Sequence, residues 1–186
     1  MKTYHVLVLV WLLVGCSPIA KSMLPSERIV SFVTSNSVIW YGVKMNGDTI
    51  LTATHVVESC QKWNCTFEQK SLSGMKIMSY ADKSIIGNGN IDSINERKNL
   101  VVGDHVYLLR YSSWQLRRYD AEITGLERDY IGVDASLSGT YLTWAIEISI
   151  ALEKGESGLP VWTLSWDLVW VVSASDSIAG KSYIVR

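Results

Sequence analysis

Two short segments of this chain hold residue types that act together in nucleophilic catalysis. Thr52-Ala53-Thr54-His55 places a histidine directly after an apolar stretch, and Gly155-Glu156-Ser157-Gly158 places a serine between glycines. A serine hydroxyl is a weak nucleophile and needs a base within hydrogen-bond reach, and histidine suits that task because its pKa lies near neutrality. Each segment alone is a weak signal, since a lone histidine near a strand end is more often structural. The two in this order are far more specific.

The body that must position these residues is rich in β-branched and aromatic residues, which favour strands. Candidate strands in the first half are 29–33, 37–43, 49–53 and 75–78, with a hairpin turn signal at Asn46-Gly47-Asp48. Candidate strands in the second half are 106–110, 116–124, 130–133, 141–150, 160–164, 168–173 and 182–185. About a dozen short strands at this spacing predict an all-β fold, a barrel or a sandwich.

The two motifs resemble those of the trypsin-like serine proteases of the chymotrypsin superfamily. The family's Thr-Ala-Ala-His differs from Thr52–His55 at one position, and its Gly-Asp/Asn-Ser-Gly-Gly-Pro matches Gly155–Pro160 at four of six. The resemblance runs from about residue 28 to the C-terminus and is closest in style to minimal bacterial members, including the Deg-type proteases. It implies two packed six-stranded antiparallel β-barrels, over residues 28–99 and 100–186, with the active site in the cleft between them.

The resemblance also implies a role for each motif residue. Ser157 corresponds to the nucleophile and His55 to the general base, and the backbone amides of Gly155 and Ser157 correspond to the oxyanion hole. The flanking glycines permit the tight turn that points these two amides at one spot. Each such donor is worth ~2.7–4 kcal/mol of the barrier.

The third member of such a triad is a carboxylate that orients the histidine, and the sequence leaves three candidates open. Asp82 opens Asp82-Lys83-Ser84-Ile85-Ile86, the nearest match to the family's Asp-aliphatic-Ala-aliphatic strand, although Lys83 stands where an aliphatic residue is expected. Asp92 and Asp104 are the rivals. Asp104 lies in a stretch that resembles the opening of the second barrel, which follows the catalytic carboxylate in bacterial members, and this favours Asp82.

By resemblance, the floor of the substrate pocket lies at Ala151, and Ser173 and Ala174 form part of one wall. No carboxylate stands at Ala151, so we expect cleavage after a small or medium apolar residue rather than after Lys or Arg.

Two residues depart from the serine motif. Glu156 stands where the family has Asp or Asn, the residue that in the digestive enzymes pairs with an N-terminus freed by zymogen cleavage. We expect no switch of that kind here. Leu159 replaces the second glycine after the serine and adds bulk beside the catalytic loop. It either narrows the primed side of the site or marks an inactive relative.

The N-terminal segment has the anatomy of an export signal, with Lys2, an apolar run over 6–14 and then Gly15-Cys16. Its end resembles the lipobox of bacterial lipoproteins. That resemblance implies a signal peptide over 1–15, cleavage before Cys16, a lipid on Cys16 and a linker over 16–27. The expected location is a membrane anchor facing the periplasm or the cell exterior. An ordinary signal peptide with an incidental cysteine is the alternative.

An oxidising compartment permits a local disulfide between Cys60 and Cys65, and two free thiols are the alternative. The net charge of -1, from 17 basic and 18 acidic residues, argues against a nucleic-acid partner bound through a basic surface. The three histidines are too scattered for zinc, so we expect no metal and no cofactor.

The expected partners are a protein or peptide substrate and, through the lipid, the membrane. The sequence therefore predicts a lipid-anchored serine endopeptidase. The alternative is a catalytically inactive protease-like lipoprotein that binds a surface partner.

Overall fold

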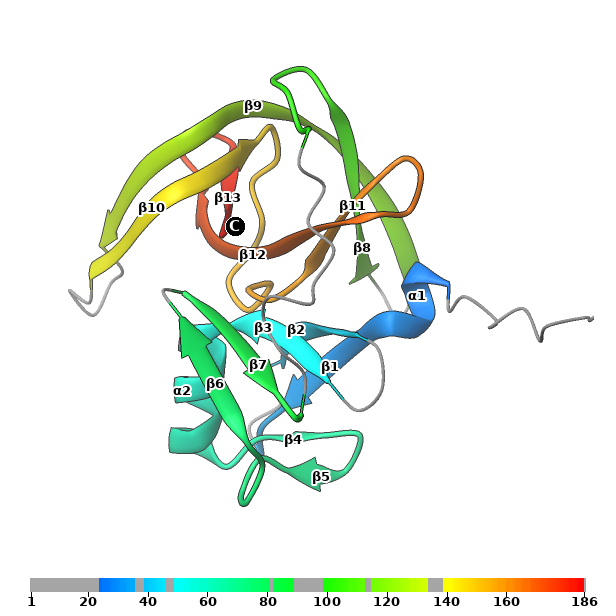
Figure 1. The fold of residues 1–186 in the computed structure, drawn as a ribbon, viewed down its shortest axis with the longest axis vertical. Coiled ribbons are helices and arrows are strands. Elements are labelled where there is room, and N and C mark those ends of the chain that lie inside the picture. The colour runs from blue at the N-terminus through cyan, green and yellow to red at the C-terminus, as the bar shows by residue number, and fades with distance from the viewer. Residues whose placement is uncertain are drawn as a thin grey trace, which may run out of the picture.

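The computed structural model describes residues 24–35, 39–45, 49–80, 82–88, 99–112, 115–133 and 139–185. Three predicted features lie outside these ranges: the leader with Cys16, the hairpin turn at 46–48, and Asp92. The chain forms two packed β units, with the first below the second in Figure 1.

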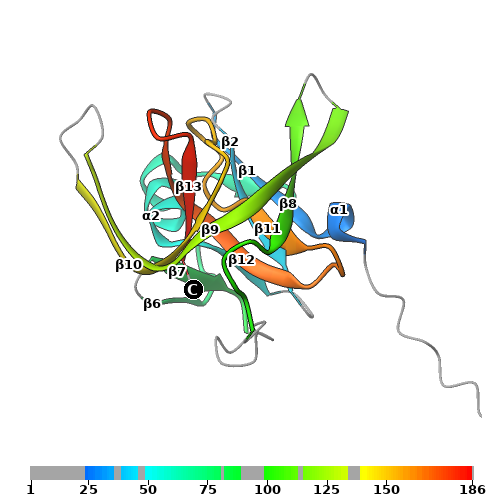
Figure 2. The same cartoon turned by 90° about the horizontal axis from the view of Figure 1, so that it is seen from above.

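The first unit is an antiparallel sheet of seven strands in the order β5-β4-β1-β2-β3-β7-β6 (Figure 1). Its strands are β1 (Ile29–Val33), β2 (Ile39–Lys44), β3 (Ile50–Ala53), β4 (Thr66–Phe67), β5 (Lys70–Ser71), β6 (Ile77–Tyr80) and β7 (Lys83–Ile86). Two helices accompany it, α1 (Pro25–Arg28) and α2 (Thr54–Trp63). Figures 1 and 2 show these helices on opposite sides of the molecule.

The second unit is a closed six-stranded barrel in the order β10-β13-β12-β11-β8-β9. Its strands are β8 (His105–Ser112), β9 (Gln115–Val133), β10 (Gly139–Ile148), β11 (Pro160–Thr163), β12 (Leu168–Asp176) and β13 (Lys181–Val185). The all-β prediction of a chymotrypsin-like two-unit fold is confirmed. The first unit differs from the expected six strands because the short hairpin β4–β5 adds to one edge of its sheet.

Helix α2 was not predicted from the sequence, in which strand-forming residues dominate. Its β-branched Val56 and Val57 have modest helix propensity, but both side chains are buried together with Cys60 on the side of the helix that faces the sheet. The helix ends at Asn64 in the left-handed conformation, and the Asn64 amide donates to the Cys60 carbonyl. Directly after this cap, Cys65 forms a disulfide with Cys60. The C-terminal end of α2 is therefore fixed twice.

Strand β9 joins two predicted strands into one. Register shifts against β10 give β9 an extra residue near Glu127 and give β10 an extra residue near Trp144. Both residues have positive φ, 54° and 59°. Such bulges let a strand bend and continue, so the predicted strands 116–124 and 130–133 run on as one strand.

A single apolar core crosses from the sheet into the barrel. Its members from the sheet are Tyr41, Val43, Leu51 and Ile85, and its members from the barrel include Leu108, Ile146, Val161, Trp162 and Trp170. A second, smaller core lies between the sheet and α2. Because the larger core is common to both units, close packing sets how the units sit against one another.

Candidate active site

His55 lies in the first turn of α2, directly after β3. Its Nδ1 atom is 3.3 Å from both carboxylate oxygens of Asp82. The Thr54 amide also donates to the Asp82 backbone carbonyl at 3.0 Å. The strand register explains this contact, because Ala53 at the end of β3 pairs with Lys83 at the start of β7. The residues just beyond this pair, His55 and Asp82, therefore meet at one end of the sheet.

The two rival carboxylates are placed differently. Asp104 belongs to the turn that opens the barrel, where its side chain accepts a hydrogen bond from the Val101 amide at 3.1 Å. Asp92 lies outside the described residues. Among the described carboxylates, Asp82 is the one in contact with the His55 ring.

Ser157 lies in a tight loop between the barrel and the sheet. The Gly158 amide donates to the Val172 carbonyl at 2.7 Å, and the Ser157 carbonyl accepts from the Tyr41 amide of β2 at 3.0 Å. Gly158 has φ +85°, and a Cβ atom there would overlap the carbonyl oxygen of Tyr41. A glycine is thus needed at 158 both for its backbone angle and for this close approach between the units.

The amides of this loop alternate between bonded and free. The Glu156 amide donates to the Glu153 carbonyl, and the Gly158 amide donates to β12. Among the described residues, the Gly155 and Ser157 amides donate to no protein acceptor. Gly155 has φ 95°, which an L-residue rarely adopts. Two such donors in one tight loop, on either side of Glu156, suit an incoming oxyanion.

The structure brings the sequence-predicted site residues together to different degrees. His55 and Asp82 are in direct contact, and the Ser157 loop is bonded to β2 beside the Thr52 hydroxyl, which donates to the Tyr41 carbonyl at 2.6 Å. No hydrogen bond between described residues joins the Ser157 hydroxyl to the His55 ring. Catalytic hydrogen bonds are often long or poorly aligned in structures without substrate.

The predicted pocket residues lie where β12 faces the segment before the serine loop. Ala151 and Ala174 are half-buried, and the hydroxyl of the buried Ser173 has no hydrogen-bond partner among the described residues. Ser175, the next residue of β12, is a further residue of this region that the sequence motifs did not identify. Its Oγ accepts the Leu152 amide at 2.8 Å and so ties the floor segment to the wall.

Leu159 lies in the core. Its side chain is fully buried in the core common to both units, so it adds no bulk to a substrate cleft. The apolar residue in the serine motif therefore serves packing, and the expectation that it narrows the site is wrong.

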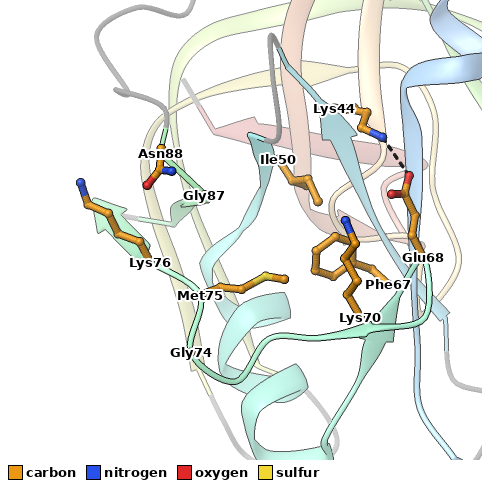
Figure 3. Close-up of a pocket in the computed structure, with 10 residues that line it drawn as sticks. All are labelled: Lys44, Ile50, Phe67, Glu68, Lys70, Gly74, Met75, Lys76, Gly87 and Asn88. Atoms are coloured by element: carbon orange, nitrogen blue, oxygen red, sulfur yellow. Dashed lines mark hydrogen bonds and ion pairs between the residues drawn. The ribbon is translucent and has the colours of Figure 1, made fainter.

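A separate pocket of about 370 Å³ lies on the first sheet, away from these residues. Figure 3 shows its lining: Lys44, Ile50, Phe67, Glu68, Lys70, Gly74, Met75, Lys76, Gly87 and Asn88. Two of these lining residues, Lys44 and Glu68, form an ion pair of 3.0 Å. None of the predicted triad, oxyanion or pocket residues lines it.

Solved structures of other proteins share the fold of this chain. No protein-family profile matches the chain, and no curated protein sequence matches it. Among solved structures, the inactive form of the Rv3671c protease superposes with a TM-score of 0.61 at 19% identity, covering 86% of this chain and 83% of that one. The chain has the trypsin-like protease fold. The active form of the same M. tuberculosis protease gives 0.61 at 18% identity over 85% and 74% of the two chains. Deg5 gives 0.57 at 14% identity over 84% and 83%.

Within the trypsin-like fold, the predicted catalytic residues come from both units. His55 and Asp82 come from the first unit and Ser157 from the second. The two forms of the M. tuberculosis protease match equally well, so the overall fold does not separate an active from an inactive arrangement. No helix among the described residues is long and apolar enough to cross a membrane.

Proposed function

We propose that the chain is a serine endopeptidase in which Ser157, His55 and Asp82 form the catalytic triad. The observation that carries this proposal is the contact of Asp82 with His55 Nδ1 at 3.3 Å, at the end of a sheet that also binds the serine loop. A carboxylate in that place fixes the imidazole tautomer, so that Nε2 is free to accept a proton.

The reaction follows from these positions. The Ser157 hydroxyl attacks the peptide carbonyl while His55 takes its proton, and the imidazolium that forms is stabilised by Asp82. The free amides of Gly155 and Ser157 receive the developing oxyanion. His55 then returns the proton to the leaving amine, and water releases the acyl group by the same steps. The substrate class is a protein or peptide.

Labelling with a fluorophosphonate probe tests the proposal. We expect wild-type protein to become covalently labelled, because the probe forms a bond only with an activated serine. The Ser157→Ala variant should stay unlabelled, and Ser165→Ala, at an exposed turn of the barrel, should label like wild type. Wild-type protein that resists the probe as completely as Ser157→Ala does would sink the enzyme assignment.

The second candidate function, an inactive protease-like binding protein, draws on one observation. No hydrogen bond between described residues joins Ser157 to His55, which is also what a silent relative would show. The labelling experiment separates the two candidates, because a silent relative keeps the fold and fails to react.

We further propose that the protein is exported and anchored through a lipid on Cys16. The leader that precedes Cys16 supports this proposal, and so does the Cys60–Cys65 disulfide, since disulfides persist in oxidising compartments. We expect Cys16→Ser to move the protein from the membrane fraction to the soluble fraction, whereas Ser17→Ala should not. Equal membrane partitioning of Cys16→Ser and wild type in fractionated cells would contradict lipidation.

A further inference from the structure

One arginine of the barrel contacts both ends of the turn that precedes Ser157. Arg110, on β8, places Nη2 at 3.1 Å from Glu153 Oε1 and Nε at 2.7 Å from Glu156 Oε1. The second contact is a close ion pair without hydrogen-bond alignment. The Arg110 and Glu156 side chains are only 14% and 10% exposed. An ion pair this sheltered is weakly screened by solvent.

The two glutamates also bind one another. The Glu153 amide donates to Glu156 Oε2 at 2.6 Å, and the Glu156 amide donates to the Glu153 carbonyl at 3.1 Å. The residues between them include Gly155, held at φ 95°. The turn is thus closed by two hydrogen bonds of its own and fastened to the barrel wall by Arg110.

The Glu153 amide and the Arg110 guanidinium both favour the charged form of the buried Glu156 carboxyl. Burial raises the pKa of the Glu156 carboxyl, while the Glu153 amide and the Arg110 guanidinium act against that rise. Glu156 also acts on the neighbouring Tyr41 of β2, because burial and then the Glu156 charge raise the pKa of the Tyr41 phenol. A buried carboxylate stripped of its partner is strongly destabilised. Loss of Arg110 would therefore release the carboxylate that braces the turn.

We propose that Arg110 is a positioning residue that holds the Gly155 and Ser157 amides where an oxyanion binds. The inference rests on the proposed function and adds a source of order for its oxyanion site. The cation that fixes Glu156 comes from within the barrel instead of from a terminus freed by cleavage. Because the pair Arg110–Glu156 is already formed in this chain, the site needs no processing step near the turn to become ordered.

Three variants test this role. Arg110→Gln removes the positive charge, and Arg110→Lys keeps the charge but not the planar guanidinium that contacts both glutamates. Glu156→Gln removes the negative charge while keeping an acceptor for the Glu153 amide. Arg118→Gln is the matched control, because Arg118 lies on the adjacent strand β9, pairs with Asp120 and is 49% exposed. The measurements are the rate of fluorophosphonate labelling and the hydrogen exchange of the Glu153 and Glu156 amides.

We expect Arg110→Gln to slow labelling by about 10²-fold, the scale of losing one oxyanion donor. Arg110→Lys should recover part of that rate, and Glu156→Gln should resemble Arg110→Gln. In both charge-removing variants the Glu153 and Glu156 amides should exchange faster, while the Val172 amide, bonded to the Leu159 carbonyl, keeps its protection. Arg118→Gln should behave like wild type in both measurements. If Arg110→Gln unfolds, Glu156→Gln tests the same ion pair.

Wild-type labelling rates in Arg110→Gln and Glu156→Gln would overturn the proposal. Slower labelling with unchanged exchange at Glu153 and Glu156 would overturn it too, because Arg110 would then act by another route. Wild-type protein that does not label at all removes the proposed function but leaves the exchange measurement decisive. Faster exchange in Arg110→Gln would then still support the holding of the turn, and unchanged exchange would refute it.

Discussion

Replacing Asp82 with asparagine is expected to lower the turnover number by ~10⁴-fold while the protein stays folded. The Asp82 carboxylate lies 3.3 Å from His55 Nδ1, where it accepts a hydrogen bond from Nδ1–H and holds the imidazole in that tautomer. An asparagine amide favours the opposite tautomer, which leaves no base facing Ser157. The loss should be measured as turnover of a peptide or ester substrate, with circular dichroism to show that the fold persists.

The rival carboxylates provide the matched controls for that result. Asp104→Asn alters a turn that is bonded to the Val101 amide, remote in sequence from either motif, and should leave turnover unchanged. Asp92→Asn should do the same. Full turnover in Asp82→Asn, together with a large loss in either control, would show that the triad has been assigned to the wrong aspartate.

Replacing Gly158 with alanine is expected to cost about 2–5 kcal/mol of the free energy of unfolding. Part of this cost is the left-handed backbone at φ +85°, which is ~1–2 kcal/mol less favourable for an L-residue. The rest is steric, since overpacking a tight site costs about 1–3 kcal/mol. The new Cβ would overlap the Tyr41 carbonyl and lie 2.6 Å from Thr52 Oγ1. The measurement is the denaturant midpoint, and labelling at Ser157 should fall with it.

Gly180 offers a control with the same backbone and none of the crowding. Its φ is +71°, and nothing lies within 4 Å of a Cβ built there. Gly180→Ala should therefore show only the backbone cost of ~1–2 kcal/mol. Equal destabilisation by the two substitutions would mean that the close approach of Gly158 to β2 contributes nothing to stability.

The sequence predicted the positions of His55 and Ser157 from local motifs but left the aspartate open because of one residue. Lys83 interrupts the apolar pattern expected after Asp82, yet it is buried, with its ammonium 5.0 Å from the ring centre of Trp170. A lysine can satisfy an apolar position when its stem packs and its charge faces an aromatic ring. No pattern along the chain reveals that partner, since Trp170 belongs to the other unit.

The other features that the sequence did not predict also depend on tertiary contacts. The β-branched start of α2 resembles a strand, and its helical state depends on burial against the sheet. The predicted strands 116–124 and 130–133 are separate in the sequence pattern, and pairing with β10 joins them through a bulge. The role of Arg110 depends on Glu153 and Glu156, far along the chain. The β-branched and aromatic composition therefore predicted most of the strands, whereas the contacts that order the site depend on residues far apart in the sequence.

The continuous core under both units has a consequence for how a substrate can be admitted. Tyr41, Leu51 and Ile85 pack in the same apolar interior as Trp162 and Trp170. Pulling the units apart would expose that interior to water at about 25 cal/mol per Å² of apolar surface. Hinge opening between the two units is therefore energetically unfavourable. A polypeptide substrate must therefore reach the Ser157 loop while the two units stay packed together. Any conformational change that selects the substrate must occur in the loops where the two units meet.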